Sequence, residues 1–412
     1  MARRVFITVG EASGDQHAGH LIRELRALDP GIIIEGLGGD EMRAAGAVVH
    51  RDTVERAAMG WRAVFRYVEL RRMLSWTSRY FQTSPPNLQI CIDSWAMNWH
   101  WAKLAHDQGI PVLYYVAPQV WASRQGRIKK LKKYIDRIAC ILPFEEKFFG
   151  DHGVEATFVG HPLFDALPRQ RMEDQADHFP NRPPVIGLAP GSRSRVASEN
   201  FPNLLDVADQ ILEAFPLATF MIPTMHSTHD VVERHLRSWK ARTSSQAPSA
   251  PPGDCAAPSD GVQTIGPFSF GMNRFDELIA HCDLCVAVSG TNNLHIAGHG
   301  VPLIVVYRLN PVIWNLAGQF IVKTRTFSLV NLLNDSHEKI VPEYIPWYGS
   351  NAPVAAKAIE YLRNPQLLAN QRERLHHLIR GINKPGASRN AANLAMDMMT
   401  SREKTLFGPI GS

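Results

Sequence analysis

The sequence predicts an α/β fold built from two doubly wound domains, each with a parallel sheet between layers of helices. The chain has 412 residues, which is more than one ordinary hydrophobic core accommodates. Short apolar runs rich in β-branched residues alternate with longer helical segments in both halves of the chain. These runs are apolar on both faces, which is typical of parallel strands covered by helices on either side.

The expected strands form two sets, one for each domain. In the first half we expect strands at residues 4–9, 30–38, 87–93, 111–116, 137–142 and 156–160. In the second half we expect them at residues 183–191, 217–223, 262–266, 282–290 and 302–307.

Three other segments complete the expected organisation. A polar, proline-containing stretch near 168–184 marks the domain boundary, so we predict domains at 1–180 and 181–412. Residues 238–262 are rich in Ser, Ala and Pro and bury too little apolar area to offset the entropy of ordering. We therefore expect a disordered surface insertion there. Beyond about residue 352 the pattern is helical and charged.

Composition and charge favour a soluble globular protein. Hydrophobic residues make up 45% and charged residues 20% of the chain, and no apolar run approaches the roughly 18–20 residues that span a bilayer. The N-terminal apolar stretch is typical of a first strand rather than a signal peptide, so we expect a cytoplasmic protein. Five scattered cysteines do not form a disulfide framework. The net charge of +5 suggests anionic partners, and we expect no nucleic-acid partner.

Ligands of doubly wound sheets bind outside the carboxyl ends of the strands, so the residues that follow each strand are candidates for a site. The first strand leads into Gly10-Glu11-Ala12-Ser13-Gly14-Asp15. Small residues there let the backbone approach a ligand at a helix N-terminus. The alternative is a tight turn capped by Ser13 or Asp15. The pattern is not G-x-G-x-x-G, so the main support for dinucleotide binding is missing.

Asp93 stands at the carboxyl end of the third expected strand. A carboxylate in this place is suited to general-base work. The alternative is an N-cap for the following helix.

Two similar turns follow strands in the second half. Gly191 and Ser192 turn the chain, with Arg193 and Arg195 at the start of the next helix. Backbone N–H groups, a helix dipole and a guanidinium together form a cradle for phosphate. Ser289-Gly290-Thr291 repeats this arrangement after another strand. Two such turns in one domain favour a phosphate-bearing ligand over two ordinary helix starts.

The sequence does not indicate a metal site. His295 and His299 are four residues apart on one helical face, a spacing that metal ions can use, but no acidic or thiol third ligand is evident nearby in the sequence. Cys282 and Cys285 have C-x-x-C spacing without a second pair, so core packing explains them better than zinc. We therefore expect neither a bound metal nor a cofactor.

Two basic segments raise the question of a membrane contact. The segment 124–137 gathers Arg127, Lys129, Lys130, Lys132 and Lys133, and the segment 59–76 mixes aromatic residues with arginines. A basic and aromatic amphipathic face can rest on an anionic membrane. The alternative is a solvated helix face above an ordinary buried stripe.

At this point the sequence resembles a known family, the lipid-A-disaccharide synthases. The resemblance covers nearly the whole chain except the 238–262 insertion and the extreme C-terminus. The blocks that match in order and spacing are GEASGD at 10–15, GLGGDEM at 36–42, ID at 92–93, YYVAPQVWASR at 114–124, LPFEEKFF at 142–149, FVGHPLFD at 158–165, PGSR at 190–193, VSGT at 288–291 and KTRTFSLVNLL at 323–333.

The resemblance implies an inverting glycosyltransferase with two Rossmann-like domains that face a cleft, the GT-B architecture. It implies transfer from UDP-2,3-diacylglucosamine to 2,3-diacylglucosamine 1-phosphate, with release of UDP and formation of the β(1→6) lipid A disaccharide 1-phosphate. It also implies a peripheral protein on the cytoplasmic face of the inner membrane that tends to form a homodimer.

The resemblance assigns roles to individual residues. It makes Asp93 the general base, Glu11 an active-site carboxylate and Arg193 a contact of the donor phosphate. The expected donor site comprises Gly191, Ser192, Arg193, Ser289, Gly290, Thr291 and His295, and Ser13, Gly14 and Asn98 are expected near the acceptor.

The sequence departs from the family pattern in three places. Ala96 replaces the second acid of D-x-P-D-F-N, His295 replaces the acid of SGTAALE, and Pro346 replaces the glutamine of VPExxQ. Two alternatives to an active synthase follow. One is an inactive relative that binds lipid or sugar nucleotide, and the other is a GT-B enzyme that acts on a different UDP-sugar.

Overall fold

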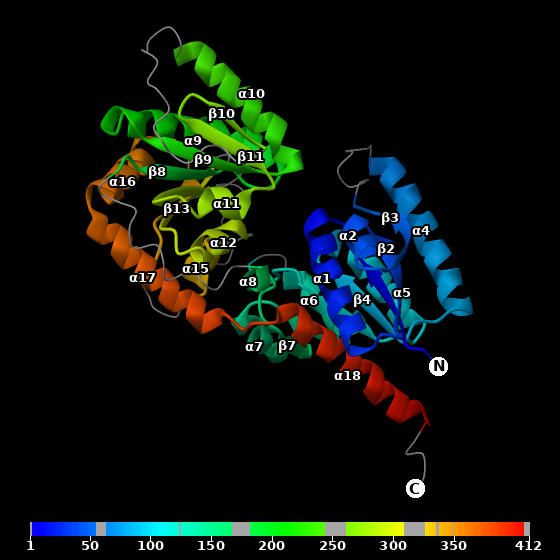
Figure 1. The fold of residues 1–412 in the computed structure, drawn as a ribbon. Helices are drawn as coiled ribbons and strands as arrows, with labels where there is room; N and C mark the ends of the chain where they lie inside the picture. Colours follow the sequence, from blue (N-terminus) through cyan, green and yellow to red (C-terminus); the bar gives the residue numbers. More distant parts are fainter. Residues whose placement is uncertain are drawn as a thin grey trace. The chain divides into compact units, whose positions relative to one another are not determined.

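A computed structural model of the chain describes residues 2–54, 63–122, 125–166, 182–243, 261–308, 326–334, 338–347 and 349–407. The chain forms two compact units. One comprises Met1–Ala166 together with Ile382–Ser412, and the other comprises Leu167–Gly381. Both units are drawn in Figure 1.

The first unit contains a seven-stranded sheet in the order β3-β2-β1-β4-β5-β6-β7, and every neighbouring pair is parallel. The order reverses between β1 and β4, which makes this pair the topological switch point. The strands are β1 (Arg4–Thr8), β2 (Ile33–Gly38), β3 (Val48–Asp52), β4 (Leu88–Ile92), β5 (Val112–Tyr115), β6 (Arg137–Cys140) and β7 (Ala156–Phe158).

Helices connect these strands and bury their apolar sides against the sheet. A continuous core joins strand residues such as Phe6 and Cys91 to Trp101 on the following helix and to Phe149 further along the chain. The first helix packs against the last helix of the chain. The elements are α1 (Ala12–Leu28), α2 (Asp40–Ala44), α4 (Ala63–Thr83), α5 (Trp95–Asp107), η1 (Gln125–Arg127), α6 (Ile128–Tyr134), α7 (Pro143–Asp151), α8 (Leu163–Ala166) and α18 (Ala387–Phe407).

The second unit repeats the doubly wound plan. Its sheet has the order β10-β11-β9-β8-β12-β13-β14, and only the β10–β11 pair is antiparallel. The switch point lies between β8 and β12. The strands are β8 (Val185–Ala189), β9 (Thr219–Thr224), β10 (Val262–Ile265), β11 (Phe268–Met272), β12 (Leu284–Val288), β13 (Leu303–Arg308) and β14 (Glu343–Trp347).

Alternate residues of the central strands bury one face of this sheet under α9 and α16, with Leu188, Phe220 and Val286 in the core. On the other face, Gly187 lies against Cys285, Cys282 and Ile279. The helices are α9 (Ser194–Ala214), α10 (His226–Thr243), α11 (Phe275–Ile279), α12 (Asn292–Gly298), α15 (Leu329–Leu332), α16 (Ala352–Arg363) and α17 (Pro365–Ile382).

The predicted pair of doubly wound domains is confirmed, with three local differences. Residues from Ile382 onward pack with the first unit, whereas we predicted that they belong to the second domain. Residues 238–243, predicted as the start of a disordered insertion, are the end of α10; most of the remaining insertion lies outside the described residues. Three strands, β3, β11 and β14, were not predicted. Among the described residues, no helix is long and apolar enough to cross a membrane.

Candidate functional site

In the first unit, the two predicted turns meet at the switch point between β1 and β4. A Cβ atom built on Gly14 would lie 3.5 Å from the Ile92 carbonyl oxygen and 3.7 Å from the Asp93 Cβ. One built on Gly10 would lie 3.2 Å from the Ser94 Cβ. The small residues at 10 and 14 therefore let the start of α1 pack against the Asp93 turn, as the carboxyl-end rule predicts.

The turn after β4 has an unusual backbone. Asp93 and Ser94 both adopt positive φ, 50° and 43°, a region that costs non-glycine residues about 1–3 kcal/mol each. Hydrogen bonds to the Asp93 carbonyl oxygen hold the turn: Tyr114 Oη donates to it at 2.5 Å and Asn98 Nδ2 at 3.0 Å. The N-cap residue of α5 is Ser94, so the alternative of Asp93 as the helix cap does not apply. The half-buried Asp93 side chain remains a candidate base.

Asn98 is fully buried below this turn. Its Nδ2 also donates to the carbonyl oxygens of Ile92 at 2.8 Å and Thr8 at 3.1 Å, and its Oδ1 accepts from Thr8 Oγ1 at 2.7 Å. Asn98 therefore joins β1, β4 and α5 beneath Asp93. Its burial and its hydrogen bonds suit a residue that positions Asp93, and its expected place near the acceptor stays a prediction.

The residues around Glu11 divide into exposed and buried ones. Glu11 and Ser13 are exposed at the start of α1, where no side chain caps the helix. Asp15 is buried, and its carboxylate accepts from the N–H groups of Gly39 at 2.8 Å and Glu41 at 2.9 Å. Asp15 therefore stabilises the neighbouring loop instead of capping its own helix. On the next turn, burial and the nearby His20 lower the pKa of His17 to about 4, so His17 is neutral at physiological pH.

In the second unit, the two predicted turns likewise flank the switch point, one after β8 and one after β12. Gly191 has a φ of 96°, which only glycine adopts readily. Ser192 and Arg193 are exposed, and Arg193 is the N-cap residue of the long helix α9. Arg195 pairs with Glu199 along the helix, at 2.8 Å. Backbone N–H groups at the start of α9 and the Arg193 guanidinium can together bind an anion.

In the second turn, Ser289-Gly290-Thr291, the middle residue is accessible and the first residue is hydrogen-bonded to another segment. A Cβ built on Gly290 would meet no atom within 4 Å, and Thr291 is exposed. The Ser289 hydroxyl donates to the Phe327 carbonyl oxygen at 3.0 Å. The predicted donor residue Ser289 therefore also anchors the segment that contains Phe327.

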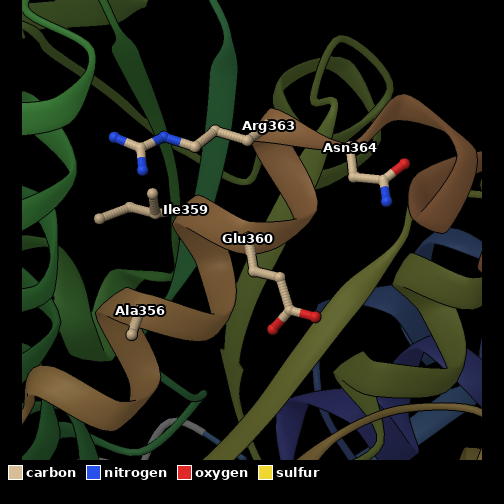
Figure 2. A pocket seen from close by; sticks show the side chains of 5 residues that line it. All are labelled: Ala356, Ile359, Glu360, Arg363 and Asn364. Atoms are coloured by element: carbon tan, nitrogen blue, oxygen red, sulfur yellow. The ribbon is translucent and has the colours of Figure 1, made fainter.

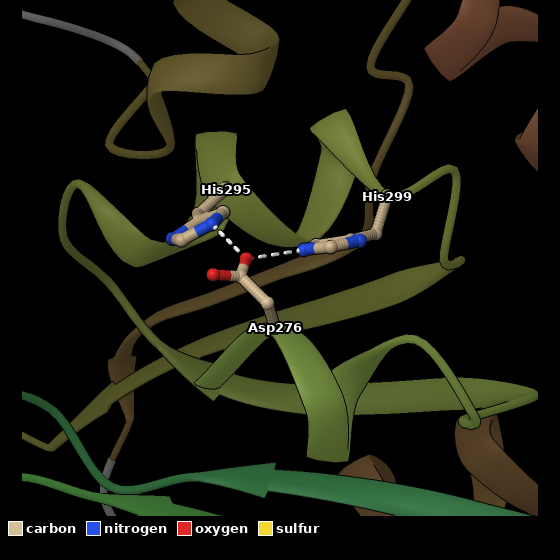
Figure 3. A group of neighbouring side chains, drawn as sticks. All are labelled: Asp276, His295 and His299. Atoms are coloured by element: carbon tan, nitrogen blue, oxygen red, sulfur yellow. Dashed lines mark hydrogen bonds and ion pairs between the residues drawn. The ribbon is translucent and has the colours of Figure 1, made fainter. Parts of the chain in front are cut away.

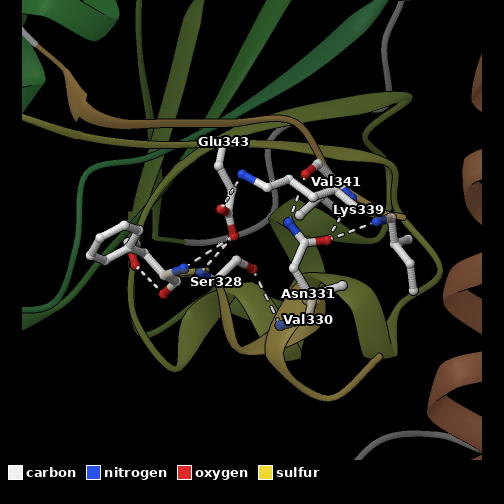
Figure 4. Close-up of polar contacts among 9 residues, drawn as sticks. Ser328, Val330, Asn331, Lys339, Val341 and Glu343 are labelled. Atoms are coloured by element: carbon white, nitrogen blue, oxygen red, sulfur yellow. Dashed lines mark hydrogen bonds and ion pairs between the residues drawn. The ribbon is translucent and has the colours of Figure 1, made fainter. Parts of the chain in front are cut away.

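Figure 4 shows how that segment is held. The carboxylate of Glu343, on β14, accepts from the Ser328 N–H at 2.8 Å and lies 3.0 Å from Lys339 Nζ. Asn331 accepts from the N–H groups of Ile340 and Val341 and donates to the Val341 carbonyl oxygen. Blocks of sequence around 289, 328 and 343 thus form one hydrogen-bonded assembly beside the open turn.

The predicted donor residue His295 has an acidic neighbour that the sequence did not reveal. Its Nε2 lies 2.6 Å from Asp276 Oδ1, and His299 Nε2 lies 2.7 Å from the same oxygen (Figure 3). The two imidazoles hold the pKa of Asp276 well below its usual range. Asp276 comes from α11, so only the packing of α11 beside α12 brings the three side chains together.

Two further features carry no role in the predicted site. Cys282 and Cys285 are buried free thiols, and burial raises the pKa of both.

A hollow on α16 is lined by Ala356, Ile359, Glu360, Arg363 and Asn364 (Figure 2). None of the residues predicted from sequence lines this hollow.

Sequence comparison identifies the family. The family model described as lipid-A-disaccharide synthetase matches residues 5–260 and 268–397. The chain belongs to the lipid-A-disaccharide synthase family. The lipid-A-disaccharide synthase of Trichlorobacter lovleyi is 32% identical over 401 residues, which cover 96% of this chain and 98% of the relative. The predicted membership is confirmed.

Solved structures with little sequence similarity share the fold. A UDP-GlcNAc 2-epimerase from Neisseria meningitidis, bound to UDP-GlcNAc, aligns with a TM-score of 0.56 and 11% identity over 97% of this chain and all of its own. A glycosyltransferase from Rickettsia africae aligns with a TM-score of 0.55 and 11% identity over 98% of this chain and 99% of its own. The predicted GT-B fold class is confirmed.

Proposed function

We propose that the chain joins UDP-2,3-diacylglucosamine to 2,3-diacylglucosamine 1-phosphate, releasing UDP and forming the β(1→6) lipid A disaccharide 1-phosphate. The observation that carries this proposal is membership of the lipid-A-disaccharide synthase family over residues 5–260 and 268–397. The positions of the predicted residues around both switch points support it.

The second unit would bind the UDP-sugar donor. The Neisseria epimerase of similar fold was solved with UDP-GlcNAc, and the turns at Gly191 and Gly290 offer accessible backbone next to an exposed guanidinium, Arg193. The diphosphate leaving group gains negative charge as its bond to the sugar breaks. Backbone N–H groups and Arg193 would stabilise that charge.

The first unit would supply the base. The Asp93 carboxylate would take the proton from the acceptor hydroxyl as that oxygen attacks the anomeric carbon from the face opposite UDP, which inverts the configuration. Tyr114 and Asn98 fix the backbone of Asp93, so the position from which the carboxylate extends is set before the substrates bind. Glu11, at the exposed start of α1, would be a second carboxylate of the site.

The acylated substrates imply a membrane surface, and we place the contact on α6. Lys129, Lys130, Lys132 and Lys133 are exposed on this helix. Lys130 Nζ lies 3.4 Å from the centre of the Trp99 ring, so an aromatic side chain of α5 adjoins the basic face. This combination suits peripheral binding to the anionic inner membrane. Trp61 and Arg62 of the second basic segment lie outside the described residues.

Incubation of the purified chain with both diacylated sugars tests the proposed function. UDP and a disaccharide 1-phosphate should appear together, in equal amounts, and neither should form when the acceptor is omitted. UDP-GlcNAc offered in place of the acylated donor distinguishes a GT-B enzyme of different specificity. Tight UDP binding without any disaccharide would identify the chain as an inactive relative and overturn the proposal.

A further inference from the structure

Three side chains of the second unit, of types that can bind metal ions, converge on one point (Figure 3). Asp276 lies on α11, His295 lies on α12, and His299 directly follows α12. The ligand atoms of these side chains all lie within 4.8 Å of one another. The two imidazoles, four residues apart at the end of α12, point their Nε2 atoms at the same carboxylate oxygen, at 2.6 and 2.7 Å.

The two imidazoles are held in place by packing. The side chain of His299 is only 1% exposed and that of His295 is 18% exposed. Their rings are stacked, with centroids 5.4 Å apart, and the Phe275 ring stacks on the outer imidazole at 4.3 Å. Side chains that are fixed before binding lose little conformational entropy when they take up a ligand.

We propose that Asp276, His295 and His299 bind one divalent transition-metal ion, for which zinc is the most suitable probe. Two imidazole nitrogens and one carboxylate oxygen form a set that suits zinc and its neighbours, whereas magnesium and calcium prefer oxygen ligands alone.

The ligand atoms lie 2.6 and 2.7 Å apart in the two Nε2–Oδ1 pairs, and all of them lie within 4.8 Å of one another. With metal–ligand bonds of about 2.0–2.2 Å, ligand atoms around a tetrahedral ion are about 3.3–3.6 Å apart. The two Nε2–Oδ1 distances of 2.6 and 2.7 Å therefore have to widen by roughly 0.6–1.0 Å, and the exposed carboxylate is the side chain with room to move. The side chain of Asp276 is 54% exposed, so a fourth coordination position opens to water.

Such an ion would cross-link α11 and α12, because its ligands come from both elements. In the structure the Asp276 carboxylate accepts hydrogen bonds from both imidazoles. A bound ion would replace these two hydrogen bonds by three coordinate bonds. Because His295 lies in the last turn of α12 and His299 is its C-cap residue, the ion would stabilise the end of this helix. The inference rests on the three side chains and does not depend on the proposed function.

Cobalt and zinc binding to the full-length chain tests the site. The tag-free protein is first treated with a chelator and desalted, and then titrated with CoCl₂ while its visible absorption is recorded. We expect one cobalt ion per chain, with the intense d–d bands of a four-coordinate ion, and displacement of the cobalt by ZnCl₂. Asp276→Asn and His295→Asn should each weaken cobalt binding at least about tenfold, because each removes one of only three protein ligands.

A matched control and a folding check complete the design. His377 is an exposed histidine on α17 in the same unit, and His377→Asn should bind cobalt as the unchanged chain does. Cooperative urea unfolding of each metal-free variant shows that it is folded; His299 is left unchanged because it is buried. Absence of cobalt binding, or equal binding by all variants, would overturn the proposal and leave Asp276 as an acceptor of two hydrogen bonds only.

Discussion

Asp93 combines a strained backbone with a candidate catalytic carboxylate. Its positive φ is maintained by the hydrogen bonds of Tyr114 and Asn98 to its carbonyl oxygen. The strain and the bonds act on the backbone, and the side chain emerges at the carboxyl end of β4. A neutral amide of the same shape therefore removes the base without disturbing the turn.

We expect Asp93→Asn to lower kcat by about 10²–10⁴-fold, because this range is what a positioned general base contributes. The urea unfolding midpoint should stay close to that of the unchanged chain. The measurement is UDP release with both acylated sugars. Asp107→Asn is a matched control, because Asp107 is an exposed residue at the end of α5, the helix that follows Asp93. If Asp93→Asn retained more than about a tenth of kcat, another group would have to be the base.

Glu145 is a buried carboxylate that the sequence did not identify as important. Its Oε1 accepts from Trp121 Nε1 at 3.0 Å, and its Oε2 accepts from the N–H groups of Ile141 and Leu142. Burial raises the pKa of Glu145 from 4.5 to about 7, although these three bonds act in the opposite direction. The folded chain therefore holds this proton at pH values at which the unfolded chain has released it.

The raised pKa of Glu145 predicts a pH-dependent stability. The contribution of Glu145 is fully present below about pH 4.5 and is lost as the pH rises through about 7. The free energy of unfolding should fall in this window by up to about 1.4 kcal/mol per pH unit relative to Glu145→Gln, which cannot titrate. Urea unfolding of both chains from pH 4.5 to 8 measures the difference. Trp121→Phe removes a hydrogen bond that lowers the pKa of Glu145, so in this variant the loss of stability should extend to higher pH. If the free energy of unfolding depended on pH in the same way in all three chains, the prediction would be contradicted.

The residues near the site differ in how far the sequence could predict them. The sequence could indicate Gly14, Asp93, Gly191 and Gly290 as candidates because each follows a strand, and parallel strands gather their carboxyl ends at one edge. Asp276 was missed because its contact with His295 depends on how α11 packs beside α12, which the spacing of residues does not encode.

At the scale of elements, the helix α6 makes the most specific prediction. It presents four exposed lysines on its outer face, and each basic residue near an anionic surface contributes on the order of 1 kcal/mol. Replacing Lys129, Lys130, Lys132 and Lys133 with Gln should weaken binding to anionic vesicles on the order of 100-fold or more. Added salt should weaken the binding of the unchanged chain, because it screens these charges.

Co-sedimentation with vesicles of anionic and neutral lipid measures this binding. The control variant removes the same number of positive charges from α10, which exposes Arg234, Arg237, Lys240 and Arg242. We expect their replacement with Gln to have little effect on vesicle binding. Equal loss in both variants would show that binding follows net charge, and no loss in either would show that α6 is an ordinary solvated helix.

The three strands that were not predicted share a physical reason. The sequence pattern used to find strands is a short run that is apolar on both faces, which describes the centre of a covered sheet. β3 and β14 lie at the edges of their sheets and consist mostly of partly exposed residues. β14 also contains Pro346, which an edge strand tolerates because one side needs no ladder hydrogen bonds. β11 is interrupted by Ser269 and Gly271.

At the scale of the whole molecule, the chain leaves the first unit after Ala166 and returns to it at Ile382. The sequence placed the C-terminal helices with the second domain because they follow it directly. The block FVGHPLFD contacts the returning chain directly. Gly160 has a φ of 101°, and a Cβ atom built on it would lie only 2.3 Å from the Lys384 carbonyl oxygen, so only glycine fits at this contact. Lys384 Nζ in turn donates to the Phe158 carbonyl oxygen at 2.6 Å.

Asp165 completes this docking and provides its test. Its carboxylate accepts from the N–H groups of Gly386, Ala387 and Ser388, at 2.8, 3.1 and 3.2 Å, and so caps the start of α18. Asp165→Ala leaves these donors without an acceptor and removes a negative charge from the positive end of the helix dipole, so it should lower the stability of the first unit by about 1–2 kcal/mol. Asp165→Asn, which keeps one acceptor oxygen, should lower the stability by less.

Amide hydrogen exchange measures the effect in each helix separately. Exchange should accelerate in α18 and in α1, which packs against it, and stay unchanged in α9 of the second unit. Equal acceleration in both units would mean that Asp165 supports the whole chain, and no acceleration in α18 would mean that the helix is held by its apolar face alone.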